Sequence, residues 1–151
     1  MTRGMRWTRR FGGMGKRRKA REIVLQALYE AEFSDRSPEE IFAGQITRRI
    51  PSDETVAHAR SLFFTTMEHL TELDEKIKSS LENWDMARVS LVDKNILRFA
   101  LTEILYFDEV PSKVIINEAI EIAHRYSSAD AGRFVNGLLD RFVREYRRGV
   151  V

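Results

Sequence analysis

The chain has 151 residues, a length that suits one domain or one domain with two tightly packed halves. It contains no apolar run long enough to span a membrane and no signal-peptide pattern, which predicts a cytoplasmic protein. The absence of cysteine excludes a disulfide framework, a thiolate metal site and a cysteine nucleophile.

The net charge of +2 hides an uneven distribution. Residues 1–21 hold nine Lys/Arg and no acid, and the remaining chain carries 16 bases against 23 acids. A basic head on an acidic body predicts a polyanion bound at the head and a basic partner at the body.

Residues 1–15 contain four glycines and four arginines without a period, and we predict a disordered basic N-terminal extension there. From 16 to 148 we predict a single helical domain, with an N-terminal half at about 16–83 and a C-terminal half at about 84–148. Its first helix has five cations near its start, where the helix dipole favours acids. Such a departure from a local rule is typical of a functional site, although a solvated basic tail explains it equally well.

That first helix places Ala20, Val24, Ala27, Leu28 and Ala31 on one face and Glu22, Gln26 and Glu30 on the opposite face.

The later segments also have helical spacing. Ser37-Pro-Glu-Glu40 matches a capping box, and Pro51-Ser-Asp-Glu-Thr55 repeats the start signal. The helix that follows either continues or bends near Leu70 and ends before Asn83. The next segment is apolar over more than half of its circumference, which predicts a central buried helix. The remaining predicted helices span about 38–48, 91–105, 114–126 and 131–146.

No segment alternates like an exposed strand, so we predict an all-α fold, a compact bundle of about six or seven helices in two packed halves. Gly137 interrupts the last helical period, and a close helix crossing is the simplest explanation for it.

Residues for catalysis or metal binding are not arranged in a recognisable pattern. The three histidines lack ligand spacing, and Gly132-Arg-Phe-Val-Asn-Gly137 is followed by Leu138 where a phosphate loop needs lysine. We therefore predict no enzymatic activity, no metal and no cofactor.

Binding of a polyanion is better supported. A basic patch alone is compatible with DNA, RNA or anionic lipid. The modest apolar face of the first helix argues against a membrane, and the last helix lacks spacing diagnostic of major-groove recognition. Single-stranded RNA needs cations beside flat side chains, for which Tyr29, Tyr126 and Phe134 are candidates, although such residues are more often in the core. The cations are Lys16, Arg17, Arg18, Lys19 and Arg21.

Four blocks in order, covering about residues 16–146, closely resemble the NusB family of bacterial transcription antitermination factors. The blocks are Ala20-Arg-Glu-x-x-Leu25-Gln-Ala-Leu-Tyr29 after the arginine-rich run, Val92-Asp-Lys-Asn-Ile-Leu-Arg-x-Ala-Leu-x-Glu103-Ile-Leu, Val110-Pro-x-Lys-Val-x-Ile-Asn-Glu-Ala-Ile-Glu-Ile-Ala123 and Arg133-Phe-Val-Asn-Gly-Leu-Leu-Asp140.

The resemblance implies an all-helical protein that binds the boxA element of nascent single-stranded RNA, chiefly of ribosomal operons. It implies that the protein acts with NusE, a small-subunit ribosomal protein, in an antitermination complex on RNA polymerase. The resemblance implies that the family's arginine-rich run corresponds to Arg17, Arg18, Lys19 and Arg21. It implies that the family's second RNA-binding region corresponds to Asp130, Arg133 and Phe134. It also implies that the acidic residue that contacts NusE corresponds to Asp93.

An alternative function is that of a related helical domain that targets RNA for an rRNA-modifying enzyme such as a methyltransferase. The end of the chain at Val151 leaves no room for a fused catalytic domain, which counts against a fused form. Homodimerisation through the apolar faces is compatible with either function.

Overall fold

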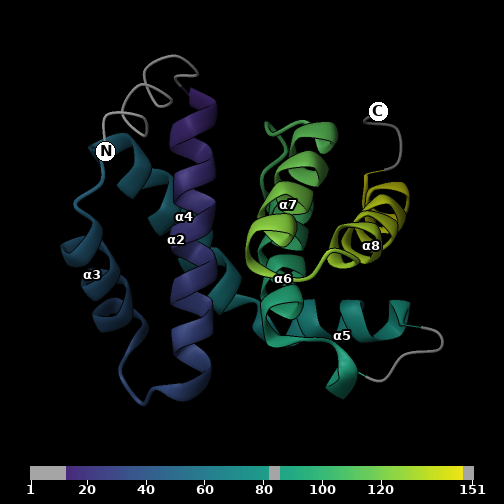
Figure 1. The fold of residues 1–151 in the computed structure, drawn as a ribbon, viewed down its shortest axis with the longest axis horizontal. Helices are drawn as coiled ribbons and strands as arrows, with labels where there is room; N and C mark the ends of the chain where they lie inside the picture. Colours follow the sequence, from purple (N-terminus) through teal and green to yellow (C-terminus); the bar gives the residue numbers. More distant parts are fainter. Residues whose placement is uncertain (1–12, 82–85, 148–151) are drawn as a thin grey trace. The chain divides into compact units, whose positions relative to one another are not determined.

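The computed structural model describes residues 13–81 and 86–147, and within these ranges it contains seven α-helices, one 3-10 turn and no strand (Figure 1). The predicted all-α fold is confirmed. No helix in these ranges is long and apolar enough to cross a membrane. The elements are α2 (Gly13–Phe33), α3 (Pro38–Arg49), α4 (Asp53–Glu68), α5 (Leu70–Ser80), η1 (Met86–Arg88), α6 (Leu91–Tyr106), α7 (Ser112–Tyr126) and α8 (Ala131–Tyr146).

The chain forms two compact units, of which the first ends at Phe64 and the second begins at Thr65. This division falls inside α4, earlier than the boundary near residue 83 that the sequence suggests. The reason is that α5 packs on α6, where the Asp74 carboxylate accepts hydrogen bonds of 2.8 and 2.7 Å from the Arg98 guanidinium. The predicted disordered extension lies mainly outside the described residues, and its last three residues begin α2.

In the first unit, α3 begins with the predicted capping box. The Ser37 hydroxyl accepts from the Glu40 backbone N–H at 3.2 Å, and the Glu40 carboxylate accepts from the Ser37 backbone N–H at 3.0 Å. The bonds from the Ser37 backbone and hydroxyl hold the pKa of the Glu40 carboxyl below its ordinary value. Both halves of the motif therefore fix the start of this helix.

The packing of α2 differs from the prediction at Glu22. Every residue from Ala20 to Leu25 is buried, so the expectation that Glu22 marks a solvent-facing side is wrong. Arg21 and Glu22 are 4% and 9% exposed, and both take part in polar or electrostatic interactions, as buried charges require. Glu30, further along α2, accepts hydrogen bonds from Gln45 and Arg48 of α3.

In the second unit, α6, α7 and α8 pack against one another, and α5 packs on α6 (Figure 1). Asp93 and all residues from Asn95 to Ile104 are buried, which confirms α6 as the central helix. The Thr102 hydroxyl of this helix accepts a hydrogen bond of 3.0 Å from the Thr66 hydroxyl, whereas Asp93 Oδ1 and Asn95 Nδ2 have no hydrogen-bond partner in the described part of the chain.

The C-terminal end of α6 is held by a buried arginine that follows α8. The Arg147 guanidinium donates five hydrogen bonds to described residues, four of them to backbone carbonyls. The final carbonyls of a helix have no partner within the helix, and a cationic side chain also suits the negative end of its dipole. Arg147 thus connects α6, the following turn and the start of α7. The acceptors are the carbonyls of Glu103, Ile104, Phe107 and Val110 and the hydroxyl of Ser112.

The explanation of Gly137 by a close helix crossing is wrong. A Cβ atom added at Gly137 would meet no atom within 4 Å, and the residue is exposed. Gly132, in contrast, lies against the His124 ring, where an added Cβ would be 2.3 Å from Nε2. The position that excludes a side chain is therefore Gly132.

We expect Gly137→Ala to raise the free energy of unfolding by about 0.5–1 kcal/mol, because alanine has less conformational freedom to lose and meets no obstacle. Urea denaturation measures this change. Gly132→Ala is the matched variant in the same helix, and it should lack this gain because the His124 ring must move. A destabilised Gly137→Ala protein would contradict the expectation.

Candidate nucleic-acid interface

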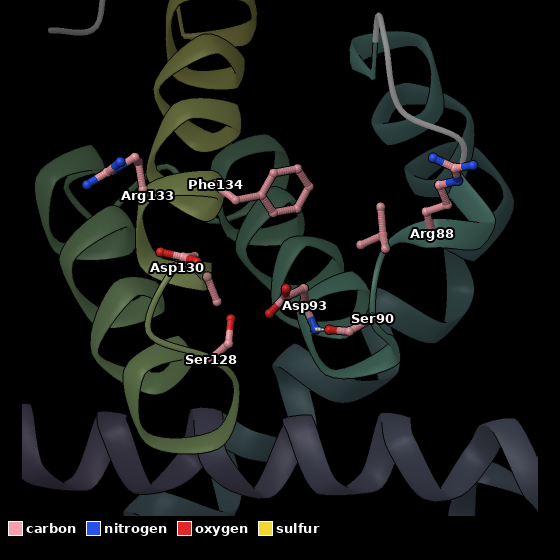
Figure 2. A pocket seen from close by; sticks show the side chains of 9 residues that line it. Arg88, Ser90, Asp93, Ser128, Asp130, Arg133 and Phe134 are labelled. Carbon is pink, nitrogen blue, oxygen red and sulfur yellow. Dashed lines mark hydrogen bonds between the residues drawn. The ribbon is translucent and has the colours of Figure 1, made fainter.

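A pocket of about 400 Å³ lies in the second unit, at the start of α6 and the start of α8 (Figure 2). Its lining combines two carboxylates, two guanidinium groups, two hydroxyls and an aromatic ring. The lining residues are Arg88, Val89, Ser90, Asp93, Ser128, Asp130, Ala131, Arg133 and Phe134.

Two helix starts position these side chains. Ser90 is the N-cap of α6, and its hydroxyl accepts the Asp93 backbone N–H at 3.1 Å, which places Asp93 in the first turn. On the other side, the turn before α8 contains Ser128, and Asp130 is the N-cap residue without a side-chain capping bond. Arg133 and Phe134 then follow in the first turn of α8. The starts of α6 and α8 thus contribute polar residues to the lining of the same pocket.

Asp93 has the most unusual environment in the pocket. It is 9% exposed, and its Oδ1 atom has no hydrogen-bond partner. Figure 2 shows its carboxylate between Ser90 and Ser128, with the Phe134 ring nearby. A buried acceptor without a donor costs free energy, so this atom is suited to receive a hydrogen bond from a ligand.

The arginines of the pocket are available to a ligand. Arg88 and Arg133 are both exposed, and neither forms an ion pair with any residue that the structure describes. They extend from opposite sides of the pocket in Figure 2, with Phe134, a half-buried ring, between them. Guanidinium groups bind phosphate oxygens well, and an aromatic ring is a stacking surface for a base.

The first unit contains the other predicted RNA-binding residues. Lys19 is exposed, Arg17 and Arg18 are partly buried, and Lys16 forms an ion pair of 3.4 Å with Glu54. Arg21 is nearly fully buried, which was not expected for a phosphate-binding residue.

Tyr29 is the aromatic candidate in this unit. It is 43% exposed and lies beside Phe33, with the ring centroids 5.4 Å apart. The expectation from the sequence that such a ring more often lies in the core is therefore wrong for Tyr29, whose ring is accessible for stacking.

The structure thus brings Asp130, Arg133 and Phe134 together, as predicted from the family resemblance, and adds Asp93 to the same pocket. Sequence reasoning missed Arg88, Ser90 and Ser128. Ser90 had a usable signal, since Ser90-x-x-Asp93 marks a helix start, but nothing in the sequence links that start to the turn before α8. Arg17 and Arg21 belong to the first unit, whereas Asp130, Arg133 and Phe134 belong to the second. That these two groups of residues lie close together therefore stays a prediction.

Within residues 13–81 and 86–147, no group of three or more His, Asp or Glu side chains is placed to hold a metal ion.

Comparison with known proteins identifies the family. The model of the NusB family matches residues 18–144. The transcription antitermination protein NusB of Salinibacter ruber is 43% identical over 130 residues, which cover 84% of this chain and 80% of that protein. The solved structure of T. maritima NusB is 38% identical with a TM-score of 0.80, over 86% of this chain and 92% of that one.

A further solved structure contains the antitermination factors NusB and NusE in complex with dsRNA. Its matching chain is 23% identical with a TM-score of 0.79, over 87% of this chain and 98% of that one, so it supports the fold alone. The match of the family model to most of the chain and the identity to curated relatives agree with the four sequence blocks. The chain belongs to the NusB family, and its similar curated relatives are transcription antitermination proteins.

Proposed function

We propose that this NusB-family protein binds boxA-type single-stranded RNA together with NusE and thereby acts in transcription antitermination in rRNA operons, within a complex on RNA polymerase. The observation that carries this proposal is one pocket that is lined by Arg88, Arg133, Phe134 and Asp93, whose Oδ1 atom is a buried acceptor without a partner, in a chain of this family.

The chemistry of the two units supports RNA as the ligand. The second unit offers an aromatic wall and two guanidinium groups, which suit a base and its adjoining phosphates. In the first unit, Arg17, Arg18 and Lys19 add charge that attracts the phosphate backbone without reading sequence. We therefore assign affinity mainly to α2 and discrimination mainly to the pocket.

The charge of the rest of the chain supports NusE as a partner. Beyond residue 21 the chain has 23 acids and 16 bases, and a surface with excess acid favours a basic ribosomal protein.

The salt dependence of RNA binding tests the role of α2. With four or five phosphate contacts, log K plotted against log salt should have a slope of about −3. Arg17→Gln/Lys19→Gln should make this slope shallower by about 1.4, because each lost contact on a single strand contributes about 0.7. Fluorescence anisotropy with a labelled boxA-type RNA and NusE at several salt concentrations measures the slope.

The matched control is Lys78→Gln/Lys113→Gln, which removes two exposed positive charges from α5 and α7. It should leave the slope close to that of the wild type. Equal slopes for the two double variants would show that α2 makes no particular phosphate contacts. Circular dichroism should show unchanged helicity in both, since Lys19, Lys78 and Lys113 are exposed and Arg17 is only partly buried.

A further inference from the structure

We propose that the pocket of the second unit receives one guanine base of the RNA and that Asp93 reads its Watson–Crick edge. This inference rests on the proposed RNA-binding function and deepens it. It also differs from what the family resemblance implies, namely that Asp93 contacts the protein partner.

The first step is the unused acceptor of Asp93. Two helices of this chain begin with a serine followed three residues later by an acid. In α3, the Glu40 carboxylate returns to the Ser37 backbone N–H at 3.0 Å and completes the capping box. In α6, the Ser90 hydroxyl accepts the Asp93 N–H, but Asp93 Oδ1 remains buried without a donor. The Asp93 carboxylate therefore lines the pocket, and its Oδ1 atom takes no part in capping α6.

The second step is the charge around this acceptor. A ligand that donates to Asp93 enters a pocket whose lining also carries the two exposed arginines Arg88 and Arg133. A lysine or arginine side chain of a protein partner would be repelled by both of them. A nucleotide instead carries hydrogen-bond donors on its base and negative charge on its phosphates, so it satisfies the carboxylate and the arginines together.

The third step is the shape of the pocket. Phe134 provides a flat wall, and the volume of about 400 Å³ is sufficient for one base with part of its ribose. Stacking on an aromatic ring orients a base so that its edge, and not its face, meets the groups at the side of the ring. Asp93 and Phe134 line the same pocket, and Figure 2 shows Asp93 below the Phe134 ring.

The fourth step is the choice of base. A carboxylate only accepts hydrogen bonds, so it favours an edge with adjacent donors. Guanine presents N1–H and the N2 amino group side by side on its Watson–Crick edge. Adenine and cytosine place a ring-nitrogen acceptor next to their amino group, and uracil flanks its N3–H with two carbonyl oxygens. The acceptor therefore selects guanine over the other three bases.

Inosine substitution tests this assignment, because inosine lacks only the N2 amino group of guanosine. A boxA-type RNA is prepared with each guanosine replaced singly by inosine and is bound to the wild-type protein with NusE. One position should weaken binding about tenfold, the effect of one lost hydrogen bond to a buried charged acceptor. Asp93→Asn should weaken binding of the unmodified RNA by about 10- to 100-fold and remove the inosine effect at that position.

Asp108→Asn is the matched control, because it removes one exposed carboxylate from the same unit outside the pocket. It should retain the wild-type affinity and the wild-type inosine effect. If Asp93→Asn loses helicity or thermal stability, the inosine series on the wild-type protein still tests whether the N2 amino group of one guanosine is bound.

Three results would overturn the proposal. Uniform binding of all inosine-substituted RNAs, with steep salt dependence retained, would remove the guanine site while leaving the proposed RNA-binding function intact. An Asp93→Asn protein that keeps its RNA affinity but no longer binds NusE would make Asp93 a contact with the protein partner. A wild-type protein that binds none of these RNAs, with or without NusE, would remove both proposals.

Discussion

Replacement of Arg147 with alanine is expected to lower the free energy of unfolding by about 3 kcal/mol, a larger effect than most single substitutions. The guanidinium is buried and donates to four backbone carbonyls, among them those of Glu103 and Ile104 in the last turn of α6. Alanine would leave these carbonyls without their cationic donor and would open a cavity between α6 and the end of α8. Urea denaturation followed by circular dichroism measures the change.

Two comparison variants define what Arg147 contributes. Arg147→Lys keeps the charge but has no planar fork of donors, so it should recover only part of the lost stability. Arg144→Ala removes an exposed guanidinium that pairs with Asp140 within α8 at 3.1 Å, and it should change stability by less than about 0.5 kcal/mol. Similar losses for Arg144→Ala and Arg147→Ala would show that the carbonyl contacts are unimportant.

Asp74→Ala should destabilise the second unit by about 2 kcal/mol, because it leaves the guanidinium of Arg98 buried without its carboxylate. The Arg98 side chain is 8% exposed, whereas that of Asp74 is 36% exposed, so most of the cost comes from the arginine that remains. Thermal and urea unfolding of the variant measure the loss. The neighbouring exposed acid on α5, Glu75, provides the control, and Glu75→Ala should have little effect.

A double variant distinguishes a buried unpaired charge from lost packing. Asp74→Ala/Arg98→Met removes both charges and retains an apolar side chain of similar length, so it should recover at least half of the stability lost in Asp74→Ala. Asn95 Oδ1, which accepts from Arg98 at 2.9 Å, then loses its donor, which limits the recovery. A double variant less stable than Asp74→Ala would show that Arg98 stabilises the protein in its own right.

The local elements were predictable because their signals lie within a few consecutive residues. The capping box at Ser37, the buried periodicity of α6 and the bounds of α8 were read from spacing and are confirmed. The bend left open near Leu70 is also present, since α4 ends at Glu68 and α5 begins at Leu70. Local propensity and apolar period decide whether a segment is helical, and both are properties of the sequence itself.

The candidate site was predictable only in part. Asp130, Arg133 and Phe134 are close in sequence, so one motif indicates them together. Asp93 is distant in sequence, and only the packing of α6 against α8 brings its carboxylate to the same pocket.

The sequence by itself determined that this chain is helical, where most helices start and end, and that it belongs with the NusB family. The tertiary structure decided which polar residues are buried and which groups share a pocket. Glu22 and Arg21 are buried despite their charge, Tyr29 is accessible despite its ring, and Gly137 lies in open space. The physical reason is that helical period assigns a residue to a face of its helix, whereas burial and hydrogen-bond partners depend on which neighbouring helix covers that face.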